Sequence, residues 1–95
     1  MILEAFSVYD KAVNAFMPPF FARSTGEAIR SFGDLAHDNS TNVCKHPSDF
    51  VLYRVGEFND NSGLFAVVEP ARLVGALEVH REDDVVNGVS VENTR

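Results

Sequence analysis

Ser24, Thr25 and Gly26 form the stretch of this sequence that best predicts an anion-binding helix start. The first amides of a helix have no partner within the helix, so they can bind a phosphate, and a glycine lets it approach closely. Basic and aromatic side chains around this stretch could complete a patch for a phosphate, a nucleic acid or a protein partner, with Phe20 stacking on a base. The candidate residues are Lys11, Phe20, Arg23, Ser24, Thr25, Gly26, Arg30 and Lys45.

A capping box competes for the same amides. Ser24 is followed three residues later by Glu27, so the Ser24 hydroxyl would accept from the Glu27 amide while the Glu27 carboxylate reaches back. Phosphate binding and helix capping are therefore alternatives at this helix start.

Residues that ligate metals or act as nucleophiles do not combine into a recognisable site. Cys44 and His46 lie two residues apart, with His37 nearby in the sequence, which is half of one structural zinc pattern. No third group orients a Cys–His pair, and the serines include no G-x-S-x-G turn. The carboxylates fall at caps, turns and strand ends, where turn chemistry and solvation explain them. We therefore expect no catalytic residue, no metal and no cofactor, and a protein that binds instead of catalysing.

The charge balance limits how this chain could contact DNA. Acidic residues outnumber basic ones by 14 to 8, and the formal net charge is −6. Binding through phosphates needs a positive surface, so any DNA contact must be local or pass through another protein. Cys44 is the single cysteine, which rules out an internal disulfide. No apolar run approaches the ~20 residues that span a bilayer, and the first residues do not resemble a signal peptide, so we expect a cytosolic protein with no membrane contact.

The elements that would position the patch follow from the hydrophobic pattern. Residues 2–9 predict a strand with two partly apolar faces, central in the sheet and covered on both sides. Residues 16–23 include two prolines and predict an extended segment that pairs back on the first strand as a loose hairpin. A helix then begins near Ser24 and ends at 38–39. Its apolar positions are Ala28, Ile29, Phe32, Leu35 and Ala36, and Gly33 weakens it by about 1 kcal/mol relative to Ala.

The second half of the chain predicts a β-hairpin. Residues 39–48 are polar and predict a loop. Two segments of strand-like alternation, 49–59 and 64–69, are separated by a cluster of turn residues. Pro70 is expected to end the last strand, and residues 72–79 predict either a short helix or an irregular strand.

The predicted fold class is α+β. Residues 1–79 would form a single domain, a small antiparallel sheet of about four strands in the order ββαββ with one amphipathic helix packed on one face. Residues 80–95 predict a flexible, acidic C-terminal tail.

Six short motifs occur in the order and spacing of a phage protein family. They are FSVYD (6–10), PPFF (18–21), TGEAIRSF (25–32), KHPSDF (45–50), VGEFND (55–60) and NSG (61–63). On these motifs, about residues 1–79 resemble the small nonstructural protein of gokushovirus-type microviruses, which are single-stranded DNA phages. Cys44 and Phe16 depart from the family pattern, so no family role is carried onto Cys44.

The resemblance implies a protein made in the infected cell and absent from the finished capsid. The family is labelled DNA-binding, or is likened by genome position to the microvirus protein that switches replication to single-strand synthesis with packaging. It has no established catalytic residues to transfer.

Three functional hypotheses follow, all placed in the host cell cytoplasm. The first is a non-enzymatic factor that assists viral genome replication or packaging through contacts with a viral replication or packaging protein and with single-stranded DNA. DNA binding through the basic patch should fall steeply with salt and should be lost when Arg23 and Arg30 are changed to Glu. The alternative is a host-directed binder that modulates a host enzyme. The third is a self-assembling module, such as a homodimer.

Overall fold

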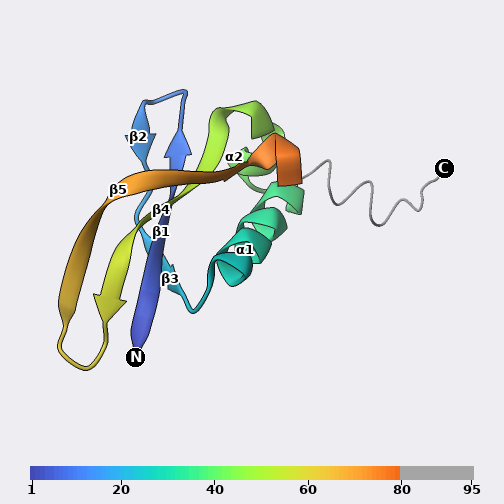
Figure 1. Cartoon of the computed structure of the whole chain (residues 1–95). Coiled ribbons are helices and arrows are strands. Elements are labelled where there is room, and N and C mark those ends of the chain that lie inside the picture. Colours follow the sequence, from blue (N-terminus) through green and yellow to red (C-terminus); the bar gives the residue numbers. More distant parts are fainter. Residues whose placement is uncertain (80–95) are drawn as a thin grey trace.

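β1 (Ile2–Asp10) lies at the centre of an antiparallel sheet in the computed structural model, which describes residues 1–79 (Figure 1). β4 (Phe50–Asn59) pairs with one edge of β1, and β5 (Leu64–Gly75) pairs with the far edge of β4. β2 (Ala15–Phe16) and β3 (Phe20–Ala22) both pair with the other edge of β1.

The predicted α+β class, with a helix on one face of a small antiparallel sheet, is confirmed. Within the described part of the chain the sheet has five strands, because the segment before the helix contributes two. The tail predicted for residues 80–95 lies outside the described residues.

The double proline divides the predicted partner of β1 into two short strands. Pro18 and Pro19 have no amide hydrogen, so neither can donate to the ladder. The amide of Met17 still donates to the Val8 carbonyl at 2.8 Å, and β3 resumes with Phe20 opposite Phe6. The segment therefore pairs with β1 as expected, but in two pieces.

α1 (Thr25–His37) begins with the predicted capping box. Ser24 is the N-cap, and its hydroxyl accepts from the Glu27 amide at 3.2 Å. The Glu27 carboxylate accepts from the Arg23 amide at 2.9 Å, one residue before the cap. At the other end the Ser40 hydroxyl and amide donate to the Asp38 carboxylate and hold the pKa of Asp38 below its usual value.

The buried stripe of α1 differs from the predicted one at two positions. Gly33 faces the core, whereas Leu35 is 37% exposed. A Cβ at Gly33 would lie 2.9 Å from Cγ1 of Val79, so the glycine makes room for the helical residues 76–79 to pack on α1.

Two short helices replace the loop predicted for residues 39–48. These are α2 (Asn42–Lys45) and the 3-10 helix η1 (Pro47–Asp49). The Thr41 hydroxyl caps α2 by accepting from the Cys44 amide at 3.2 Å, and Pro47 supplies the fixed φ of a helical first residue. Val43 joins the core. Helices this short carry no periodic signal, which is why the sequence did not predict them.

Pro70 does not end β5, contrary to the sequence prediction. The strand continues to Gly75 because it lies at the edge of the sheet, where a missing amide hydrogen can face away from the ladder. The register shifts between Arg54 and Gly56, whose partners are Ala71 and Val67, so Pro70 lies in an irregular stretch of the pairing.

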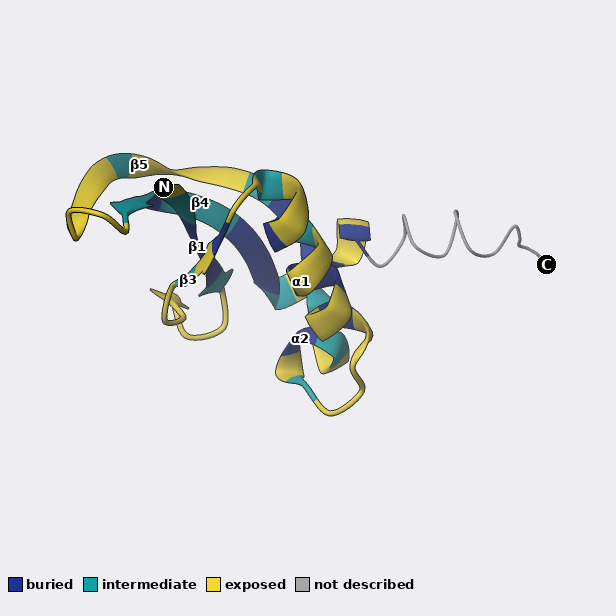
Figure 2. Cartoon of the chain, turned by 90° about the horizontal axis from the view of Figure 1, so that it is seen from below, coloured by how far each residue is buried: buried dark blue, intermediate teal, exposed yellow. Residues whose placement is uncertain are grey.

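The core fills the space between the sheet and the helices. Phe6, Phe32 and Leu52 are its largest fully buried side chains, and Figure 2 shows the buried residues on the sheet-facing side of α1 and along β4. Both α1 and α2 lie on this one side of the sheet (Figures 1 and 2). β1 is central, as predicted, but no helix in the described residues covers the opposite side of the sheet.

Candidate functional site

The open face of the sheet, opposite the helices, is lined by aromatic side chains. The pairing register fixes its members: from β1, Leu3, Ala5, Ser7 and Tyr9; from β2 and β3, Phe16 and Phe21; from β4, Val51, Tyr53, Gly56 and Phe58; from β5, Phe65, Val67, Arg72 and Gly75. Side chains alternate between the faces of a strand, so the odd-numbered residues of β1 all lie here. The face thus holds six of the ten aromatic residues of the chain.

Three of these rings form one cluster where β1, β2 and β4 run together. Tyr9 lies 5.0 Å from Phe16, and Phe16 lies 5.3 Å from Tyr53, measured between ring centroids. The rings are steeply inclined to one another, and Phe16 is 45% exposed. The Tyr9 hydroxyl hydrogen-bonds the Asn14 side chain at 3.1 Å. Partly exposed rings held by their neighbours in this way can stack on a planar ligand.

The other three rings form a second cluster nearer the turn between β4 and β5. Phe58 lies 4.7 Å from Phe65 and 5.5 Å from Phe21. Phe21 is 43% exposed and Phe65 is 64% exposed. Between the clusters Ser7 is buried, and its hydroxyl donates to the Met17 carbonyl at 2.6 Å. The open face therefore offers two aromatic surfaces on one side of the sheet.

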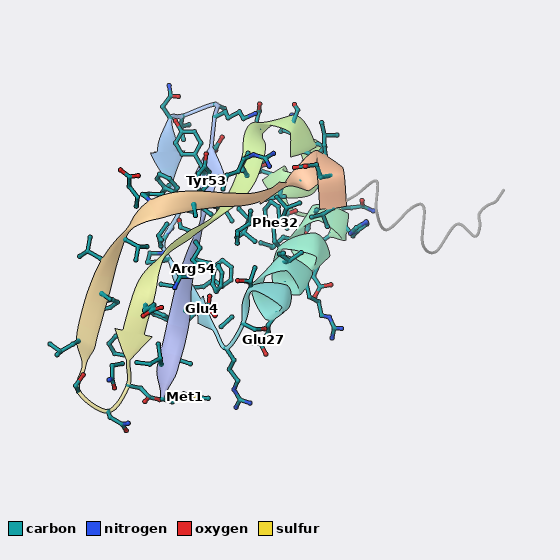
Figure 3. All side chains as sticks on the ribbon, viewed as in Figure 1. Met1, Glu4, Glu27, Phe32, Tyr53 and Arg54 are labelled. Carbon is teal, nitrogen blue, oxygen red and sulfur yellow. The ribbon has the colours of Figure 1, made fainter. Side chains whose placement is uncertain are left out.

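Acidic side chains of β1 and β4 lie on the other face. Glu4 and Glu57 are directly opposite each other, and Arg54 binds both, with nitrogen–oxygen distances of 3.0 Å and 2.7 Å. Figure 3 shows Glu4 and Arg54 together near the start of α1. Among the residues that the register places on the open face there is no carboxylate, and the one charged member is Arg72, which binds Glu78 at 2.7 Å. Within the paired residues of the described strands, the acidic side chains Glu4 and Glu57 therefore lie on the face opposite the rings.

Carboxylates surround the predicted phosphate site at the start of α1. The Ser24 hydroxyl already accepts from the Glu27 amide, and the Thr25 hydroxyl donates to Glu4 at 3.4 Å. Negative side chains at a helix N-terminus interact favourably with its dipole and would repel a phosphate there. Of the two alternatives at this helix start, the geometry supports capping by Ser24 and Glu27 over phosphate binding.

The basic residues of the predicted patch do not gather in one place. Lys11 directly follows β1, and its amide donates at 2.8 Å to the carbonyl of Asp49, the last residue of η1. Arg23 follows β3 at the opposite end of β1, since Ala22 pairs with Glu4. The rise of a strand separates the levels of Lys11 and Arg23 by about 25 Å. Arg30 and Lys45 are exposed on α1 and α2.

Phe20 is oriented toward the core and not toward solvent. It pairs with Phe6 on the helix face, and the two ring centroids lie 5.8 Å apart. Its neighbour Phe21 is the ring on the open face. The sequence shows that adjacent strand residues point to opposite faces, but the assignment of the two rings needed the register with β1.

The open face itself was not predicted from the sequence. Alternation in β1 and β4 does predict that Tyr9 and Tyr53 point away from core residues such as Phe6 and Leu52. It could not predict that Phe16 and Phe21 would join them, because the pairing of β2 and β3 depends on the path around Pro18 and Pro19.

No cluster of three or more potential metal-ligating side chains occurs in the described part of the chain. The Cys44 thiol points to the Asn39 side chain at 3.4 Å, and Nδ1 of His37 lies 2.7 Å from the Gly33 carbonyl oxygen. A shallow depression of about 300 Å³ near the β4–β5 turn is lined mainly by apolar atoms and by Glu57, Asn59 and Ser62, without a histidine or cysteine. Within residues 1–79 no helix is long and apolar enough to cross a membrane.

The chain was compared with protein-family models, with curated proteins and with solved structures. Residues 3–79 match the family model described as Phage ORF5 protein. No curated protein and no solved structure matches the chain significantly.

Proposed function

The chain belongs to the Phage ORF5 protein family, and we propose that it is a non-enzymatic phage protein that assists replication or packaging of a single-stranded DNA genome by binding unpaired bases on its open face. It would act in the host cell cytoplasm, alongside a viral replication or packaging protein. The family match covers residues 3–79, the same part of the chain that forms the sheet and its helices.

The observation that carries the proposal is the pair of aromatic clusters on a face where the pairing register of the described strands places no carboxylate beside the rings. Each cluster has an exposed ring, Phe16 in one and Phe21 and Phe65 in the other. Sheets that present aromatic rings bind unpaired nucleic acid by stacking, and stacking accepts any base. The missing negative charge matters because a carboxylate beside a ring would repel the phosphates on either side of a stacked base.

Few cations are available for the DNA backbone. Arg72 lies on the open face beside Tyr53, where it would have to exchange its pairing with Glu78 for a phosphate, and Arg23 follows Phe21 by two residues. If these two neutralise one phosphate each, the logarithm of the binding constant should fall with the logarithm of salt concentration with a slope of about −1.4. The steep salt dependence expected for the basic patch does not apply to this face.

A titration of a fluorescent oligothymidine with the full chain tests the proposal. Phe16→Ala, Phe21→Ala and Phe65→Ala each remove an exposed ring, so each should weaken binding by about 5- to 150-fold if that ring stacks on a base. Tyr at these positions should preserve binding, because the ring remains. Leu35→Ala and Leu77→Ala remove exposed apolar side chains away from the open face and should leave the affinity unchanged.

Equal binding by the ring variants and the native chain would overturn the proposal, as would equal affinity for a duplex of the same length. Circular dichroism of each variant checks that the sheet is retained, which is expected because all three rings are more than 40% exposed.

A host-directed binding function is the second candidate. The excess of 14 acidic over 8 basic residues favours a basic protein partner over a nucleic acid, and an exposed apolar patch is also typical of protein interfaces. A pull-down from host lysate separates the two. One stoichiometric host protein, retained after nuclease treatment and lost with the ring variants, would favour this second function.

A further inference from the structure

The two edges of the sheet are protected very differently. The edge formed by β2 and β3 has strands of two and three residues with Pro18 and Pro19 between them. The opposite edge is β5, which has twelve residues and pairs on one side with β4. Among the described elements none pairs with its outer side. Proteins normally protect such an edge with charge, proline or short length, because its unpaired backbone groups can bind another strand.

β5 has such protection in its second half but not in its first. Beyond Val68 the strand carries two charged residues, Glu69 and Arg72, and Pro70, which has no amide hydrogen to donate. Residues 64–68 read Leu-Phe-Ala-Val-Val, with no charge and no proline. Leu64 is 70% exposed and Val67 is 96% exposed. In Figure 2 this part of β5 lies on the outside of the sheet, coloured mostly as exposed.

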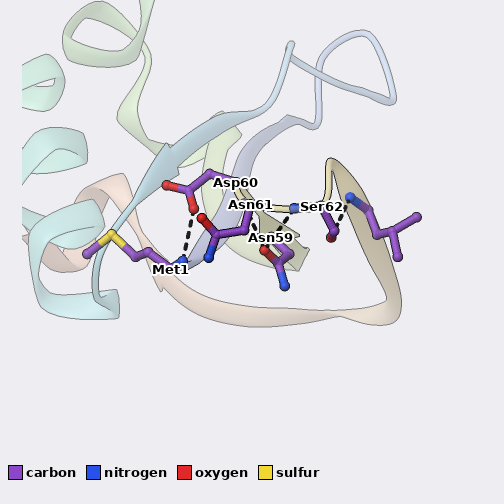
Figure 4. Close-up of polar contacts among 6 residues, drawn as sticks. Met1, Asn59, Asp60, Asn61 and Ser62 are labelled. Carbon is purple, nitrogen blue, oxygen red and sulfur yellow. Dashed lines mark hydrogen bonds and ion pairs between the residues drawn. The ribbon is translucent and has the colours of Figure 1, made fainter.

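The turn before this segment is held by several contacts (Figure 4). The Asn59 side chain accepts from the amides of Asn61 and Ser62 at 2.9 Å and 3.2 Å, and the Met1 amino group binds Asp60 at 2.9 Å. Gly63 supplies the positive φ of +76° that closes the turn. The segment 64–68 is therefore presented as a formed strand, which lowers the entropy cost of pairing with another one.

We propose that the occupant of this edge is a second copy of the chain, with β5 pairing antiparallel to its copy about a two-fold axis at Ala66. A symmetric contact places each surface against itself, so charged segments repel, and in a chain of net charge −6 an uncharged strand avoids that cost. Centring on Ala66 places Phe65 of each copy opposite Val67 of the other. Aromatic and β-branched residues form favourable cross-strand pairs, and here the pair occurs twice.

The area favours a reversible dimer over an obligate one. The exposed parts of Leu64, Phe65 and Val67, with the strand backbone, amount to roughly 400–500 Å² per copy. Stable interfaces bury about 800 Å² per partner, so the dimer should form in a concentration-dependent way.

Such pairing has a consequence for the open face. The two-fold axis of a symmetric antiparallel pair runs perpendicular to the sheet, so the same face of both copies points to the same side. Two open faces would then join into one surface across the dimer, with Phe65 of each copy at the junction. The dimer does not depend on the proposed binding of DNA, and it is tested without DNA.

Cysteine crosslinking of the full chain tests the register. With Cys44→Ala as background, Ala66→Cys places the two new thiols opposite each other, with Cα atoms about 5 Å apart and within disulfide range. Mild oxidation should yield a covalent dimer. Leu64→Cys is the matched control. In this register position 64 of one copy lies about 13 Å from position 64 of the other, which is too far for a disulfide.

Analytical ultracentrifugation provides an independent measurement. Val67→Lys introduces a charge at the edge without touching the core, and it should raise the dissociation constant at least tenfold, whereas Val67→Thr should change it little. A chain that stays monomeric up to millimolar concentration, or that crosslinks at Leu64→Cys as readily as at Ala66→Cys, would overturn the proposal.

Discussion

β4 and β5 approach each other so closely at Gly56 that no side chain fits there. A Cβ built there would lie 2.9 Å from the backbone oxygen of Ala66, and a backbone atom cannot rotate away. The glycine sits where the pairing of β4 shifts register against both β1 and β5. The register shift that decides which side chains of β4 and β5 reach the open face thus lies next to a position without room for a side chain.

We expect Gly56→Ala to lower the free energy of unfolding by about 1–3 kcal/mol, as overpacking does in a close-packed interior. Urea denaturation measures it. Gly26→Ala is the matched control, since the nearest atom to its Cβ is 4.0 Å away, and a helix gains up to about 1 kcal/mol from that change. If both variants were equally stable, the close approach at Gly56 would have no energetic consequence.

Arg54 holds together two carboxylates that face each other across β1 and β4. Changing it to Met keeps much of its length but leaves Glu4 and Glu57 without a cation in a partly buried position. We expect a loss of about 1–3 kcal/mol in unfolding free energy. Arg72→Met breaks a half-exposed pair with Glu78 and should cost less than about 1 kcal/mol. Equal losses would show that the position of Arg54 between two carboxylates makes no extra contribution to the free energy of unfolding.

Among the elements, the sequence predicted those that carry a long regular pattern. β1, α1 and β4 have nine or more residues each, with clear alternation or a capped apolar stripe, and they occur where expected. The short helices α2 and η1 were not predicted because they are too short to carry a periodic signal. The continuation of β5 past Pro70 was not predicted because it depends on the pairing of β5 with β4 at the edge of the sheet. The candidate site could be predicted only in part. Alternation along β1 and β4 places Tyr9 and Tyr53 on the face away from the core, but only the strand register shows that Phe16, Phe21 and Phe65 lie on the same face.

The packing of α1 against the residues that follow β5 can be tested by substitution at Gly33. Gly33→Ala should raise helix propensity by about 1 kcal/mol, but its methyl group would meet Cγ1 of Val79 at 2.9 Å. We expect no gain in unfolding free energy from Gly33→Ala in the native chain. In a Val79→Ala background the same change should be stabilising. An equal gain in unfolding free energy in both backgrounds would contradict a close contact between Gly33 and Val79.

For the whole molecule, the distribution of charge matters more than its total. The net charge of −6 argues against DNA binding only if the acidic residues lie over the binding surface. Glu4, Glu27 and Glu57 instead lie at the helix face and at the start of α1. Among residues 1–79, the members that the register places on the open face are apolar or aromatic apart from Ser7 and Arg72, which suits bases more than phosphates.

Salt dependence checks this distinction. We expect oligothymidine binding to weaken by less than tenfold between 50 and 200 mM salt, since two phosphate contacts correspond to a slope of about −1.4. Arg23→Gln should make the slope shallower, whereas Lys45→Gln, a substitution on α2, should not change it. A slope of −4 or steeper would indicate a basic surface in place of the open face.

The most direct test of the account is an NMR titration of the ¹⁵N-labelled full chain with a short oligothymidine. We expect the largest amide shifts along the open face, at Ser7, Phe21 and Tyr53, with little change from Thr25 to Arg30. Shifts concentrated at the start of α1, or no shifts at millimolar oligonucleotide, would contradict the assignment of the open face as the binding surface.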